Sequence, residues 1–136
     1  MTTALAVFML VMAVGIAGMW TVDILRSPEI DRSRGLVRAR DRNGSVMLPH
    51  WVAEYGTAAM LLVGGLGLLL GWPAGAWGWL VPAGLGALAY TGLNSQAWVL
   101  ADRSRAAYGI PIGVGFVGAL AGLALILAGA VRVPVG

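Results

Sequence analysis

Four long apolar stretches make up most of this 136-residue chain and limit what it can fold into. They cover residues 3–25, 49–70, 81–100 and 110–131. Each is close to the ~20 residues that an α-helix needs to cross the hydrocarbon core of a bilayer. Charged residues make up only 11% of the chain, against about 25% in soluble domains. The sequence therefore predicts a single all-α domain, an integral membrane bundle of four spanning helices.

The distribution of arginine predicts how this bundle is oriented. Of the nine basic residues, six fall within 26–48 and two within 101–109, whereas the connection 71–80 has none. Because cytoplasmic loops collect Lys and Arg, we expect both termini outside and the two basic loops in the cytoplasm. The expected location is the plasma membrane, with several crossings. The loop-localised charge argues against nucleic acid as a partner.

The connection 26–48 is the longest polar segment, and three structures are compatible with it. It could lie on anionic lipid headgroups, where each arginine near the surface contributes about 1 kcal/mol. It could hold a short helix that begins at Ser27-Pro28-Glu29, or a β-hairpin around Asn43-Gly44. The arginines expected to contact headgroups are Arg32, Arg34, Arg38, Arg40 and Arg42.

Polar residues within the apolar stretches gather near the predicted cytoplasmic end. In the second stretch, the spacing of His50, Glu54 and Thr57 places them on one helical face. We expect a cytoplasm-facing polar pocket between the first three spans, which binds a proton, a cation or a small solute. Its predicted members are Glu54, His50, Asp23, Asn94, Thr57 and Ser95.

Glu54 is the residue that points most directly to function, because a carboxylate at membrane depth costs about 2.5–3.5 kcal/mol to insert. Three interpretations remain open. Glu54 could bind a proton, since removal from water favours the neutral carboxyl group. It could instead be a helix-start residue near Pro49 that reaches the surface, or form an ion pair with Arg26 or another arginine of the loop.

The residue inventory excludes several kinds of chemistry. The chain has no cysteine, no lysine and one histidine, so thiol chemistry, a lysine Schiff base and a bis-histidine haem within one chain are excluded. Asp23, His50 and Glu54 have the ligand types of a facial triad, but a second histidine is missing. The sequence therefore predicts no metal and no cofactor, and no phosphate-binding or dinucleotide motif is present.

Small residues predict close helix packing. Gly67 and Gly71, and Gly118 and Gly122, form two GxxxG motifs, which let helix backbones approach each other in lipid. We expect them to serve mainly packing within the monomer, with a homo-oligomer or a membrane-complex partner as a further use. The fourth stretch, 110–131, has no polar side chain before Val131, so a packing role is expected for it.

Three functions are compatible with these observations. The first is a small transporter or channel subunit in which Glu54 binds a proton, a cation or a small solute. The second is a non-catalytic accessory subunit of a larger membrane complex. The third is a membrane enzyme that acts on a lipid or a quinone, with Asp23, His50 and Glu54 as acid–base groups. The chain has few residues that could act in catalysis, which favours a protein that is not an enzyme. We expect the first function.

Overall fold

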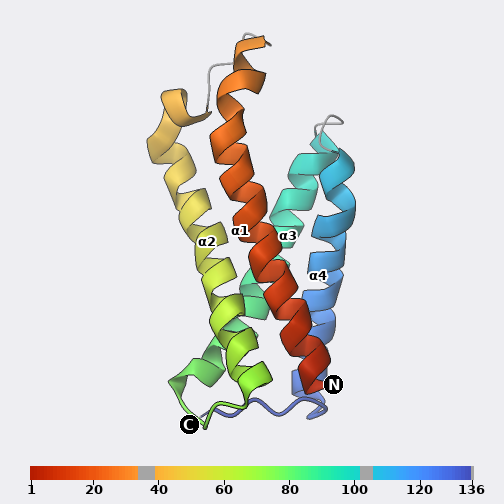
Figure 1. The fold of residues 1–136 in the computed structure, drawn as a ribbon. Helices are drawn as coiled ribbons and strands as arrows, with labels where there is room; N and C mark the ends of the chain where they lie inside the picture. Colours follow the sequence, from red (N-terminus) through yellow and green to blue (C-terminus); the bar gives the residue numbers. More distant parts are fainter. Residues whose placement is uncertain (34–38, 102–105, 136) are drawn as a thin grey trace.

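The computed structural model describes the backbone of residues 1–33, 39–101 and 106–135, and the side chains of 1–22, 25, 51–96 and 108–135. These residues form four α-helices and one 3₁₀ turn, and no strand occurs among them. The elements are α1 (Thr2–Ser33), α2 (Ala39–Leu70), η1 (Ala76–Trp79), α3 (Leu80–Ala101) and α4 (Ala106–Leu127) (Figure 1). The prediction of an all-helical chain is confirmed.

Within the described part of the chain, three helical segments are long and apolar enough to cross a membrane: Thr2–Val22, Trp51–Leu70 and Tyr108–Leu127. They coincide with three of the predicted spans and are consistent with an integral membrane protein. The remaining predicted span, 81–100, lies within the 22 residues of α3. Its crossing of the membrane stays a prediction.

The two termini lie at the same end of the molecule (Figure 1). The connection between α2 and α3, which contains η1, lies at this end as well. The last residues of the chain pass beneath the helices, where the Gly75 N–H donates a hydrogen bond to the Pro134 carbonyl oxygen at 3.2 Å. An antiparallel arrangement of four helices accounts for this placement, whereas the side of the membrane stays a prediction.

The structure corrects the expected loop between the first two spans. α1 continues through Ser27-Pro28-Glu29 to Ser33, so no separate helix begins at Ser27. α2 begins at Ala39, which makes residues 39–48 helical and excludes a hairpin strand there, whereas residues 36–38 lie outside the described part. The physical reason is that extending an existing helix adds one hydrogen bond per residue, whereas an isolated hairpin is marginal in water.

The core follows one face of α1. Leu5, Met9, Ala13, Ile16 and Trp20 are all buried, and they recur every three or four residues, as one helical face requires. This face packs against buried aliphatic residues of α2 and α3. α1 lies mainly against α2, and α3 mainly against α4, whereas α1 and α4 contact each other over few residues.

The contact between α1 and α4 depends on glycine. A Cβ at Gly122 would lie 2.8 Å from the Leu5 side chain, and a Cβ at Gly118 would clash with the Phe8 ring. These glycines therefore accommodate side chains of the same chain, as the sequence predicted for their main role. Nothing in the structure bears on their use between two copies.

The glycines of the other GxxxG motif do not bring two helices together. Gly67 accommodates the ring of Trp77, which leaves no room for a Cβ. Gly71 follows the last residue of α2 with φ of 64°, the left-handed conformation expected of a C-cap glycine. Gly71 therefore caps the C-terminal end of α2.

Candidate functional site

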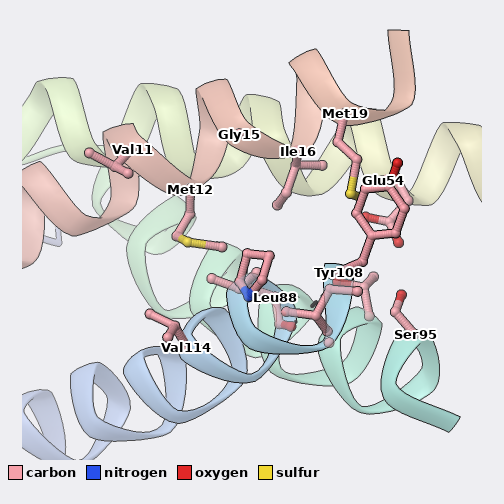
Figure 2. Close-up of a pocket in the computed structure, with 14 residues that line it drawn as sticks. Val11, Met12, Gly15, Ile16, Met19, Glu54, Leu88, Ser95, Tyr108 and Val114 are labelled. Carbon is pink, nitrogen blue, oxygen red and sulfur yellow. Dashed lines mark hydrogen bonds between the residues drawn. The ribbon is translucent and has the colours of Figure 1, made fainter. Parts of the chain in front are cut away.

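A cavity of about 490 Å³ lies between α1, α3 and α4, and Glu54 of α2 reaches it from behind (Figure 2). Its volume falls within the ~300–1,000 Å³ typical of small-molecule sites. The residues that line it are Val11, Met12, Gly15, Ile16, Met19, Glu54, Leu88, Thr91, Gly92, Ser95, Tyr108, Pro111, Ile112 and Val114. We refer to this cavity as the α1–α4 pocket.

The α1–α4 pocket has a buried floor and an exposed rim. The floor includes Leu88 and Glu54, each with 3% of its surface exposed. The rim consists of residues on the outer faces of two helices, with Val11 of α1 63% exposed and Val114 of α4 58% exposed. The pocket therefore opens through the side of the bundle, where α1 and α4 separate.

The polar groups of the pocket lie at one of its ends (Figure 2). Glu54, Ser95 and Tyr108 gather near Met19, whereas Val11, Met12 and Val114 lie at the opposite end. Apart from these polar groups and Thr91, whose hydroxyl donates a hydrogen bond to the Leu88 carbonyl oxygen at 3.4 Å, the lining is apolar. The pocket is thus amphipathic along its length, and the one carboxyl group among the described residues of its lining lies at one end.

The structure places Glu54 deep in a helix. α2 begins at Ala39, so about four turns of helix precede Glu54. The interpretation of Glu54 as a helix-start residue near Pro49 is therefore wrong, because a helix dipole acts within the first turn. Glu54 also lies within the segment Trp51–Leu70 that can cross a membrane.

Aromatic residues hold Glu54 in place. The indole of Trp20 on α1 interacts with the Glu54 side chain, and Trp20 is itself only 4% exposed. At the next position along each helix, the hydroxyl groups of Thr21 and Tyr55 lie within hydrogen-bond distance at 2.8 Å. These two adjacent pairs fix α1 against α2 and set the direction of the carboxyl group.

A second polar contact fixes the opposite wall of the pocket. The Gln96 side-chain amide on α3 donates a hydrogen bond to the Gly109 carbonyl oxygen on α4 at 2.7 Å. Pro111, which lines the pocket, lies two residues further along α4 and inside the helix. α4 begins at Ala106, so Pro111 lies beyond the first helical turn, where a proline is most easily accommodated.

Only some of the predicted site residues line the α1–α4 pocket. Glu54 and Ser95 line the pocket together. Thr57 is buried but does not line it, since its hydroxyl donates a hydrogen bond to the Ala53 carbonyl oxygen at 2.8 Å within α2. Asn94 is exposed and turned away from the pocket, as one of the two amides beside Ser95 must be. The side chains of Asp23 and His50 lie outside the described part of the structure.

The expected pocket needs two corrections. It was expected between the first three spans, whereas the fourth helix forms one of its walls. It was expected to be polar, whereas most of its lining is apolar. The predicted site residues did not include Thr91 and Tyr108, which also line the pocket. The helical spacing of Thr91 and Ser95 already placed these two on one face of the third span. No sequence signal pointed to Tyr108, which precedes the fourth apolar stretch.

Metal binding has no support within the described side chains, where no three acidic or histidine residues are grouped closely enough to hold an ion. No protein-family model, curated protein or solved structure matches this chain. The chemistry of the α1–α4 pocket is therefore the best guide to its function.

Proposed function

We propose that this protein is a small membrane transporter in which Glu54 binds the transported proton, cation or small solute. The single observation that carries the proposal is the buried carboxyl group that lines the α1–α4 pocket. An ionisable group in a membrane span is costly and marks a substrate or ion pathway in many membrane proteins. A pocket of this volume next to such a group gives a solute a place to bind.

The proposal includes a topology. α3, with 22 residues, is about 33 Å long and serves as the fourth span. Both termini face the outside of the plasma membrane, because the arginine-rich ends of α1 and α2 stay in the cytoplasm. At 32 residues each, these helices are about 48 Å long and exceed the ~30 Å hydrocarbon core. Their arginine-rich extensions then reach the anionic headgroups.

The other two functions have less support. An accessory subunit was suggested by the small residues of α4, but Gly118 and Gly122 accommodate Phe8 and Leu5 of the same chain. An enzyme acting on a lipid or a quinone needs acid–base groups beside its substrate. Among the described residues that line the pocket, Glu54 has the only carboxyl group, and the other polar side chains, Thr91, Ser95 and Tyr108, offer only hydroxyl groups.

Proton flux in proteoliposomes tests the proposed function. Vesicles that contain the purified protein and the pH-sensitive dye pyranine receive a pH jump outside. We expect protein-dependent equilibration that falls about tenfold or more in Glu54→Gln, because the amide keeps the shape of the side chain and cannot bind the proton. Thr57→Val is the matched control, since Thr57 is buried in the same helix but does not line the pocket. Equal flux in wild type and Glu54→Gln, or none above empty vesicles, would refute proton transport through Glu54.

A further inference from the structure

The position at which the α1–α4 pocket opens determines whether a ligand enters it from water or from the lipid bilayer. Its rim residues Val11, Tyr108 and Val114 are 63%, 47% and 58% exposed, and all three lie in segments apolar enough to cross a membrane. In a bilayer this rim faces lipid chains. A ligand that passes through it must therefore be soluble in the hydrocarbon region, which excludes a small hydrated ion as the molecule that fills the apolar part.

The selectivity of the pocket depends on its polar end. Lipid chains are as apolar as the lining, so a ligand that moves from the bilayer into the pocket gains little from apolar contacts. Glu54 is the only carboxyl or basic side chain among the described residues of the lining. At low dielectric an interaction with one charged group is strong, so the charge of the ligand decides which molecules bind.

From this geometry we infer that the cargo is a hydrophobic monocation, an apolar body with one cationic head. The inference rests on the proposed function and specifies its substrate class. The head lies beside Glu54, Ser95 and Tyr108, and the body lies along α1 between Met19 and Val11, a length of about 12 Å (Figure 2). One positive charge matches one carboxylate, whereas a hydrophobic anion is repelled by it.

Gly15 offers a way to test whether the apolar part of the pocket is used. Gly15 lines the pocket, and a Cβ built there meets no neighbouring atom within 4 Å. The first atom of a side chain at this position therefore meets no neighbour, and we expect a leucine there to extend into the pocket. Gly18 on the same helix also has no neighbouring atom within 4 Å, but it does not line the pocket. Gly18→Leu is thus a matched control for Gly15→Leu.

The experiment measures equilibrium binding to the full chain in lipid nanodiscs, with uptake by empty nanodiscs subtracted. The probes are decyltrimethylammonium and decyl sulfate, which have the same chain and opposite charge, both below the concentration at which they form micelles. We expect saturable binding of the cation only. Its affinity should fall about tenfold or more, or ~1.4 kcal/mol, in both Glu54→Gln and Gly15→Leu. Gly18→Leu should stay within about twofold of wild type.

The possible results distinguish a failure of this inference from a failure of the proposed function. Equal binding of the two probes, or cation binding that neither Glu54→Gln nor Gly15→Leu weakens, would overturn the substrate class. Glu54-dependent proton flux without cation binding would also overturn it and leave the proposed function standing. Glu54-dependent cation binding without proton flux would support the substrate class and count against proton transport alone.

Discussion

The hydroxyl groups of Thr21 and Tyr55 lie 2.8 Å apart and join α1 to α2 immediately beside the Trp20–Glu54 interaction. Four residues, two consecutive ones on each helix, thus form one polar contact in segments that are otherwise apolar. The contact explains how a carboxyl group in a segment apolar enough to cross a membrane can have a fixed direction. We therefore expect mutations at the Glu54 end of the pocket to have clearer effects than mutations at its apolar end.

The Thr21–Tyr55 hydrogen bond should contribute measurably to stability. We expect a double-mutant cycle of Thr21→Val and Tyr55→Phe to give a coupling of about 0.6 kcal/mol, the average for interhelical hydrogen bonds in a membrane protein. The free energy of unfolding, measured by titration from mild detergent into SDS, provides the four values of the cycle. Additive effects of the two substitutions would show that this hydrogen bond does not stabilise the protein.

The two amides beside Ser95 should respond differently to the same substitution. Gln96→Leu removes the hydrogen bond to the Gly109 carbonyl oxygen and should cost about 0.6–1.7 kcal/mol of unfolding free energy. Asn94→Leu changes an exposed side chain and should stay within about 0.5 kcal/mol of wild type. The same SDS titration measures both, and an equal loss in the two variants would contradict the assignment of Gln96 as the interhelical contact.

A methyl group should be tolerated at one glycine of α2 and not at another. Gly67→Ala places its Cβ against the Trp77 ring and should destabilise the protein by about 1–3 kcal/mol, the usual cost of overpacking. Gly56→Ala places its Cβ where no neighbouring atom lies within 4 Å, so it should be neutral or stabilising. Thermal unfolding in detergent compares the two variants. A Gly67→Ala variant as stable as wild type would show that Trp77 does not pack on this helix as described.

The absence of cysteine makes the proposed orientation easy to test. Ala74 is exposed in the connection between α2 and α3, and Ser104 belongs to the basic segment after α3. In intact cells, a membrane-impermeant maleimide should label Ala74→Cys and leave Ser104→Cys unlabelled until the cells are opened. The reverse pattern would place the arginine-rich ends outside and refute the orientation predicted from charge.

Sequence reasoning found the helices and missed the shape of the pocket. The apolar stretches follow from composition and length, and the structure has a helix in each of them. The helical extensions of α1 and α2 were missed because Pro28 and Pro49 were interpreted as helix starts, whereas both lie inside longer helices. A proline is compatible with either position, and only the surrounding structure decides.

The site was only partly predictable for a different reason. The cost of a carboxylate in a membrane span identified Glu54 without any structure. The wall formed by α4 depends instead on how Phe8 packs against Gly118 at one end, while α1 and α4 separate toward the beginning of α4 at the other (Figure 1). Such a separation is a tertiary property, and the periodicity of one helix contains no information about it.

The central claim is that the Glu54 carboxyl group can be reached from the bilayer through the opening between α1 and α4. Dicyclohexylcarbodiimide tests it directly, because this apolar reagent reacts with carboxyl groups that it meets in a hydrophobic environment. After treatment in lipid nanodiscs, peptide mass spectrometry should find Glu54 as the main modified residue among the six acidic ones. Gly15→Leu should suppress the modification and Gly18→Leu should not. An unmodified Glu54, or modification that Gly15→Leu leaves unchanged, would contradict the account.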